Sequence, residues 1–182
     1  MTICFLIFCN LILISLVSLV ILLAFKLGFL RYTKILKGKN WSAKTFGTKY
    51  VISLENSSEI SETLKSFVVS AKIRVGLIGG LGAVNEATLR FFDPKTKKYV
   101  DKTFKGQMEI SNLTGNISTK DGKEYLHLHI TLGDENYQTI SGHLLSAKLS
   151  GAGEFYAEKF IGSSVERSFS DEIGLNLYDF DK

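Results

Sequence analysis

The sequence predicts an α+β domain built on a largely antiparallel β-sheet with one or two packed helices, preceded by an apolar N-terminal helix. Three observations predict this class. Most apolar runs after residue 44 are short, alternate with polar residues and end at Gly, Asp or Asn, as half-buried strands do. One early segment has a helical period instead, and residues 3–25 form a long uncharged run. Many strands with one early helix are typical of the α+β class.

The N-terminal segment, residues 1–30, leaves two main interpretations open, with an uncleaved or unusual signal sequence as a third. Residues 3–25 contain no charge, and a helix of that length, rising about 1.5 Å per residue, would cross a hydrocarbon core of ~30 Å. Basic residues follow, so the first interpretation is a transmembrane helix with a cytoplasmic domain behind it. The second is a mis-called translation start, which would make the whole protein cytoplasmic.

Charge is distributed unevenly along the chain. The net charge is +4, yet seven basic residues precede the first acid, Glu55. From residue 50 onward 15 basic residues face 18 acidic ones, so this part is near −3. We interpret residues 31–43 as a basic linker and residues 44–182 as the domain. We expect a mildly acidic domain to bind DNA only weakly, because non-specific affinity comes mainly from phosphate neutralisation. The basic linker suits DNA or anionic lipid equally well.

The first elements of the domain are a strand and a helix. Residues 49–54 alternate polar and apolar side chains and predict a strand. Asn56 is a plausible N-cap with Glu59 three residues later. The apolar side chains that follow lie on one face of a helix; they are Ile60, Leu64, Phe67, Val68 and Ala71.

The rest of the domain is predicted to form strands. Residues 73–80 predict a strand that runs into glycines, and residues 87–93 predict another that forms a hairpin with 97–104 across Asp93-Pro94. Further strand-like runs separated by Gly, Asp and Asn complete the sheet; they cover residues 108–118, 123–134, 137–149 and 153–162.

The glycine-rich stretch GLIGGLGAVNEA resembles a phosphate loop only superficially. It lacks the Gly-Lys-Ser/Thr ending of a P-loop and has Asn85 where a dinucleotide fingerprint needs its third glycine. We therefore interpret Gly79, Gly80 and Gly82 as a tight structural turn in which side chains do not fit.

The histidines carry the strongest chemical signal, since all three lie in the window HLHITLGDENYQTISGH. His127 and His129 are two residues apart on a predicted strand, so they share one face. The strand breaks near Gly133, and an antiparallel return would bring His143 to the same place. Neutral imidazole nitrogens suit zinc or a similar divalent ion, and three of them leave a fourth position open. The alternative is three ordinary strand histidines.

Two acidic residues are candidates for a supporting role beside the histidines. Metal-bound histidines usually donate their second N–H to a carboxylate or carbonyl. Glu109 and Asp134 are the candidates for this second layer, although a carboxylate in a turn is more often a turn-former. No residue is assigned a catalytic role.

Several motifs together resemble the plant and prokaryote conserved (PPC) domain, which also occurs beside AT-hooks in plant nuclear proteins. They are GLGAVNEATLRFFD, QMEISNLTGNIS, the histidine window with Gly142-His143-Leu144, and the ending DEIGLNLYDF. The resemblance covers about residues 44–182 and is closest to prokaryotic members. Ser141 departs from it, because the family usually has Gly before Gly-His.

The resemblance implies an α/β fold on an antiparallel sheet, assembly as a homotrimer, and a metal held by His127, His129 and His143. It also implies an association with DNA, although this chain lacks the Arg-Gly-Arg-Pro core of an AT-hook. Three functions remain open. They are a DNA-associated regulatory oligomer, a metal-binding ligand module without DNA binding, and a zinc-dependent enzyme of unknown substrate.

Overall fold

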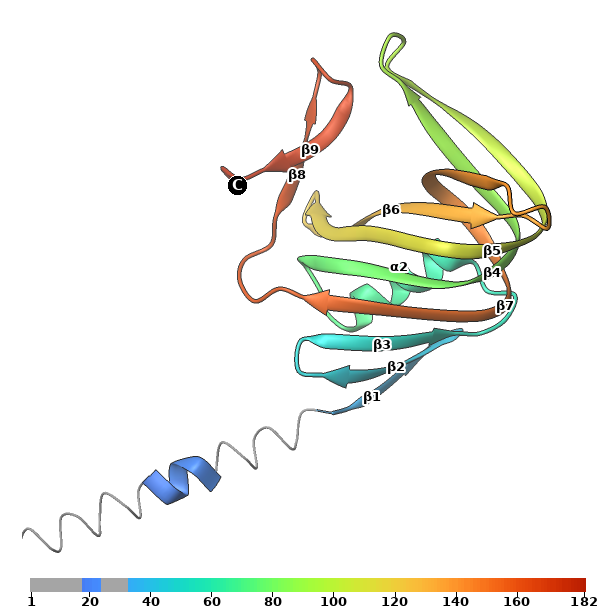
Figure 1. Cartoon of the computed structure of the whole chain (residues 1–182). Helices are drawn as coiled ribbons and strands as arrows, with labels where there is room; N and C mark the ends of the chain where they lie inside the picture. The colour runs from blue at the N-terminus through green and yellow to red at the C-terminus, as the bar shows by residue number, and fades with distance from the viewer. Residues whose placement is uncertain (1–17, 24–32) are drawn as a thin grey trace, which may run out of the picture. The chain divides into compact units, whose positions relative to one another are not determined.

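The computed structural model describes residues 18–23 and 33–182, and the chain divides into two compact units, Met1–Lys34 and Ile35–Lys182. Residues 18–23 form a short helix (Figure 1). The predicted membrane-spanning segment, residues 3–25, lies outside the described residues apart from that helix. Within the described ranges, no helix has both the length and the apolar character needed to cross a membrane.

The second unit is one mostly antiparallel sheet with a helix packed on it, which confirms the main features of the predicted fold class. Along the sheet the strands follow the order β1-β2-β3-β7-β4-β5-β8-β9, and β6 pairs with β5 and β7. The strands are β1 (Ile35–Gly38), β2 (Trp41–Phe46), β3 (Lys49–Leu54), β4 (Gly76–Asp93), β5 (Lys98–Lys120), β6 (Lys123–Gly133), β7 (Thr139–Lys159), β8 (Glu166–Ser170) and β9 (Leu175–Asp179), with helix α2 (Ile60–Ser70) between β3 and β4.

The long central strands close into a ring of pairings. β4 pairs with both β5 and β7, and β6 pairs with the same two strands. Strands of this length must bend to do so, and the register between β4 and β5 shifts at two places in β4, where bulges bend a strand. The prediction of shorter strands separated by glycine turns is therefore wrong, because several of those glycines lie inside continuous strands.

Gly79, Gly80 and Gly82, predicted to form a tight turn, are an example. All three lie inside β4. A Cβ on Gly79 would come within 2.5 Å of the Tyr156 hydroxyl oxygen, and one on Gly80 would overlap the Phe155 ring. Gly82 has a φ of +153° beside a register shift. The absence of room for a side chain was correctly inferred, but its cause is close contact with β7 and not a turn.

Helix α2 begins after Glu59, which is the N-cap in place of the predicted Asn56. The Glu59 carboxylate accepts hydrogen bonds from the backbone N–H of Ser61 at 3.1 Å and of Glu62 at 2.6 Å. The same carboxylate accepts from the backbone N–H of Ala147 in β7 at 2.9 Å. One side chain therefore satisfies the helix start and joins it to the sheet.

The apolar face of α2 forms the centre of the core, as its period predicts. Ile60, Leu64, Phe67 and Val68 are all fully buried. The Phe67 ring lies edge-on to Trp41 of β2 and Tyr50 of β3, with centroids 5.3 and 5.4 Å apart. Residues on the sheet face that α2 covers complete the core, including Leu128 and Ile130 of β6. Residues that alternate with these on β6 must therefore lie on the opposite face.

The domain starts at Ile35 and not at residue 44. β1 and β2 form an antiparallel hairpin that pairs with β3, and Trp41 and Ala43 lie in the core. Most of residues 31–43, predicted as a basic linker, is therefore sheet. Lysines occupy exposed positions of these short strands, such as Lys37 and Lys44, and so gave the segment the composition of a linker.

Two hairpins stand apart from the rest of the sheet, at the end away from β1 (Figure 1). The first is the β4–β5 tip, whose predicted turn is confirmed by the register pair Asp93–Lys98. The second is β8–β9, which meets β5 through one parallel bridge. Both expose large apolar side chains, among them Phe91, Phe169 and Phe180.

Candidate metal centre

The β6–β7 hairpin brings the three histidines together. Strand alternation buries Leu128 and leaves His127 and His129 on the face away from α2. Asp134 shapes the turn that follows, because its carboxylate accepts hydrogen bonds from the backbone N–H groups of Asn136 and Gln138. β7 then returns antiparallel, and His143 becomes the register partner of His129. The predicted juxtaposition is confirmed.

The three imidazoles form a compact cluster. Ring centroids lie 5.2 Å apart for His127–His129, 4.9 Å for His127–His143 and 5.4 Å for His129–His143. One ring nitrogen from each lies within 4.8 Å of the others. His129 is exposed and the other two are partly buried, so the cluster is open to solvent on one side. In the part of the chain that the structure describes, these imidazoles form no hydrogen bond or ion pair, so their nitrogens are available as ligands.

Burial keeps two of these imidazoles neutral. It lowers the pKa of His143 to about 4, with further lowering by His127, His129 and Arg90 and a smaller opposite effect of Asp101. Burial is also the main cause that lowers the pKa of His127, followed by the charges of Arg167 and His129. Neutral imidazole is the form that binds a metal, so the site is ready to do so at neutral pH.

One side of the cluster is formed by the β4–β5 hairpin. Arg90 is the register partner of both His143 and Asp101. Its guanidinium donates two parallel hydrogen bonds to the Asp101 carboxylate, at 2.9 and 2.8 Å, and lies 4.8 Å from the Tyr99 ring centroid. The Tyr99 ring is 6.0 Å from that of His143. Hydrogen bonds from Arg90 hold the pKa of the Asp101 carboxyl below its usual value, so this acid stays ionised.

The other side is formed by Arg167 of β8, which is buried. Its guanidinium donates to Ser118 Oγ at 2.8 Å, to Asn116 Oδ1 at 2.9 Å and to the Asn176 carbonyl at 2.9 Å. Asn116 is the register partner of His127, which connects Arg167 to the cluster.

Two aromatic rings lie near the same guanidinium. The Tyr178 centroid lies 4.3 Å and the Tyr125 centroid 5.2 Å from its central carbon. Tyr125 is two residues before His127 on β6, so its ring shares the face of the histidines. The Arg167 side chain therefore extends from the β8–β9 hairpin to residues on the histidine face.

The two acids predicted to accept hydrogen bonds from the histidines do not do so in the described structure. Asp134 is occupied in the turn, and Glu109 is exposed and pairs with Gly133 at the far end of β6. At about 3.3 Å per residue, that position is about 13 Å along the strand from His129. Neither forms a hydrogen bond to the histidines in the described structure.

The residues that do flank the site were not singled out from the sequence. Arg90 and Asp101 could have been found by extending the predicted hairpin register from Asp93 and Lys98 inward. No local pattern marks Arg167, because its side-chain partners Ser118 and Asn116 lie about 50 residues away in β5.

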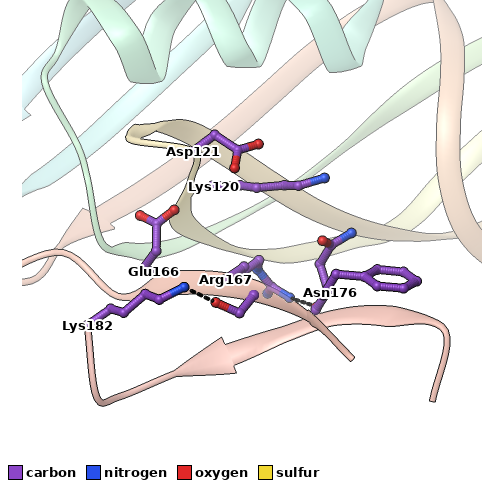
Figure 2. Close-up of a pocket in the computed structure, with 8 residues that line it drawn as sticks. Lys120, Asp121, Glu166, Arg167, Asn176 and Lys182 are labelled. Carbon is purple, nitrogen blue, oxygen red and sulfur yellow. Dashed lines mark hydrogen bonds between the residues drawn. The ribbon is translucent and has the colours of Figure 1, made fainter. Parts of the chain in front are cut away.

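A cavity of about 710 Å³ lies beside Arg167 and not over the histidines. Figure 2 shows Arg167 and Lys182 at its wall, with their hydrogen bonds to the Asn176 carbonyl and Ser168 Oγ. Its remaining walls include Lys120, Asp121 and Glu166, so its charges are mixed. The cavity therefore gives no clear preference for a ligand, and the histidine cluster is the better-defined site.

Comparison with known proteins gives a coherent result. The family described as the Plants and Prokaryotes Conserved (PCC) domain matches residues 42–161. A crystal structure of a proposed DNA-binding protein from Bacteroides thetaiotaomicron is 50% identical, with a TM-score of 0.76 over 79% of this chain and 99% of that one. No curated protein matches the chain.

Two archaeal structures are also similar. A metal-containing protein from Archaeoglobus fulgidus is 28% identical, with a TM-score of 0.68 over 81% of this chain and 98% of its own. A plant- and prokaryote-conserved (PPC) protein from Pyrococcus horikoshii is 24% identical, with a TM-score of 0.68 over 84% of this chain and 97% of its own, which supports the fold alone.

Proposed function

From the premise that this chain belongs to the Plants and Prokaryotes Conserved domain family, we propose that its domain binds one zinc or similar divalent ion through His127, His129 and His143. The single observation that carries the proposal is the cluster itself, in which three imidazole nitrogens lie within 4.8 Å of one another. A relative from Archaeoglobus fulgidus is described as metal-containing, which agrees with this proposal.

The donor set fits such an ion. Imidazole suits zinc and the neighbouring transition metals, and two nitrogens that share a tetrahedral zinc lie about 3.4 Å apart. Side-chain rotations that move the nitrogens by little more than about an ångström would bring this cluster to that spacing. Three protein ligands would leave one position for water or another ligand, on the side where His129 is exposed.

The surroundings favour a binding module over an enzyme. Hydrolytic metal sites need a nearby acid or base that can exchange a proton. Asp101 is the acid beside His143, but Arg90 occupies both of its oxygens and lowers its pKa. A carboxylate held in this way is a poor proton carrier at neutral pH.

An association with DNA is the second candidate function. The 50% identical relative is described as a proposed DNA-binding protein. Exposed lysines on the β1–β3 edge, such as Lys37, Lys44 and Lys49, offer a basic surface. Because the domain is otherwise mildly acidic, we propose that this binding is weak and that it contributes to a regulatory role in a homotrimer.

Metal analysis of the full-length protein tests the first proposal. After removal of metal with EDTA and dialysis against zinc, we expect about one zinc per protomer. A protein that stays empty in excess zinc contradicts it.

A DNA titration at increasing salt concentration tests the second proposal, and we expect the affinity to be lost by moderate salt. Sequence-specific binding at physiological salt would show that the DNA-binding role is stronger than proposed here.

A further inference from the structure

The charges around the histidines are not balanced. Two guanidinium groups lie beside the cluster, that of Arg90 next to His143 and that of Arg167 next to His127 through Asn116. Asp101 is an acid that acts electrostatically on His143. A divalent ion at the histidines would add two more positive charges. The site with its metal would therefore carry a strong positive potential.

Arg167 shows the imbalance most clearly. It is 8% exposed, and its hydrogen-bond acceptors are a hydroxyl, an amide oxygen and a backbone carbonyl, none of which carries a charge. Buried charges in proteins are usually paired, because desolvation without a counter-charge is costly. The rings of Tyr125 and Tyr178 compensate for part of that cost.

Both guanidinium groups have donors to spare. Arginine has five N–H donors. Arg167 uses three of them and Arg90 uses two, both on Asp101. The remaining donors are what a planar or tetrahedral oxyanion requires. Two tyrosines lie near the cluster: the Tyr99 ring centroid is 6.0 Å from that of His143, and Tyr125 is two residues before His127 on β6.

We infer that the open metal position takes a small oxyanion, a phosphate or carboxylate group of a free small molecule, which Arg90 and Arg167 recognise. The inference rests on the proposed metal function and assigns its ligand class. A bound metal ion would supply one contact and most of the charge. Arg90 and Arg167 supply the positive potential that selects an anion over a neutral ligand, and Asp101 weakens that potential on the Arg90 side.

This arrangement predicts opposite effects for the two members of one ion pair. Arg90→Gln removes a positive charge and leaves Asp101 uncompensated, so oxyanion affinity should fall by at least about tenfold. Asp101→Asn removes the negative charge and frees Arg90, so affinity should rise severalfold. If the pair only held the hairpin together, both variants would change affinity in the same direction. Lys65→Gln on α2 is the matched control, because it removes one exposed positive charge from the other face of the sheet.

The experiment uses full-length protein, stripped and reloaded with zinc, and inorganic phosphate as the probe in calorimetric titrations, with acetate as the carboxylate probe. Arg167→Gln is included, but that variant can lose the β8–β9 hairpin, so the decision rests on Arg90 and Asp101. Cobalt-substituted protein reports whether phosphate changes the visible spectrum of the metal. Zinc content is measured for every sample, so loss of metal is distinguished from loss of anion binding.

Phosphate binding that falls in Arg90→Gln, rises in Asp101→Asn, is unchanged in Lys65→Gln and perturbs the cobalt spectrum supports the inference. One zinc per protomer without phosphate or acetate affinity overturns it and leaves the metal function standing. Equal affinity in all variants also overturns it. Displacement of phosphate by duplex DNA at equal phosphate concentration would overturn the assignment to a free small molecule.

Discussion

His129 and His143 are direct register partners across β6 and β7, and their ring centroids lie 5.4 Å apart. Directly opposed residues on one sheet face have their Cβ atoms about 4.5–5.5 Å apart, so their side chains can contact one another. His127 joins them from the neighbouring position on the same face. The histidine cluster therefore depends on a register that the hairpin turn at Asp134 fixes.

Removing either partner should abolish or sharply reduce metal binding. His129→Ala and His143→Ala each leave two imidazoles, which cannot close the coordination shell, and we expect at least a tenfold loss of zinc affinity. Ser141→Gly, on the same strand with an exposed side chain, is the control and should bind zinc normally or better. Elemental analysis of the three variants checks this. Normal zinc content in both alanine variants would show that zinc binds at a different site.

The metal-free domain should lose stability as the pH falls from about 6.5. In the folded state His143 has its pKa lowered to about 4, and that of His127 is also lowered. The unfolded chain therefore binds more protons in this range, and the free energy of unfolding falls as the pH falls. At about 1.36 kcal/mol per pKa unit, His143 alone accounts for up to about 3 kcal/mol.

Urea unfolding in EDTA at pH 7 and pH 4.5 measures this effect. Acids with lowered pKa values, such as Asp93 and Asp179, also reduce the free energy of unfolding as the pH falls, but at lower pH. Comparison with His143→Gln isolates the contribution of the imidazole, because the free energy of unfolding of this variant should depend less on pH. An equal pH dependence in wild type and variant would refute the assignment.

Gly80 should tolerate no side chain, whereas Gly133 should tolerate alanine. A Cβ on Gly80 would overlap the Phe155 ring, and overpacking of this kind costs about 1–3 kcal/mol. At Gly133 the nearest atom is Ser111 Oγ at 3.8 Å, an ordinary contact. Denaturant midpoints of Gly80→Ala and Gly133→Ala test the contrast. Equal midpoints would argue against the close contact between β4 and β7.

The domain should assemble as a homotrimer, which we propose from the family and from the exposed apolar side chains of the two hairpins. Light scattering of residues 33–182 should give about 50 kDa, as three copies of roughly 16 kDa in a closed cyclic assembly. Phe91→Asp on the β4–β5 hairpin should weaken this assembly. Tyr137→Asp in the β6–β7 turn, which is also exposed, should leave it intact. A monomer at all concentrations would contradict the proposal.

Residues 3–25 should anchor the full-length protein in a membrane if they are translated. In that case the protein remains in the membrane fraction after carbonate washing, because a spanning helix is not removed by high pH or salt. The domain alone, beginning near residue 33, should be released. Native protein found entirely in the wash, with an N-terminus near residue 35, would indicate a mis-called start.

Local periodicity was sufficient to identify the elements that carry the site. A period of 3.6 placed Ile60, Leu64 and Phe67 on the buried face of α2. Strand alternation put His127 and His129 on one face, and a turn of the right length brought His143 back. These features depend on residues close in sequence, so a sequence pattern contains them.

What surrounds the histidines was decided by tertiary structure. Arg167 reaches the site only because β8 meets β5, and its partners Ser118 and Asn116 lie about 50 residues earlier. The glycines that were predicted to form a turn lie inside a strand, because β4 pairs with β7. Residues 31–43 became sheet because β1 and β2 pair onto β3. The amino-acid sequence thus determined by itself the clustering of the three histidines, the helix and the antiparallel strands, since these follow from local spacing. Only the folded chain decided which charges face the ligands, because strand pairing over long separations leaves no periodic pattern in the sequence.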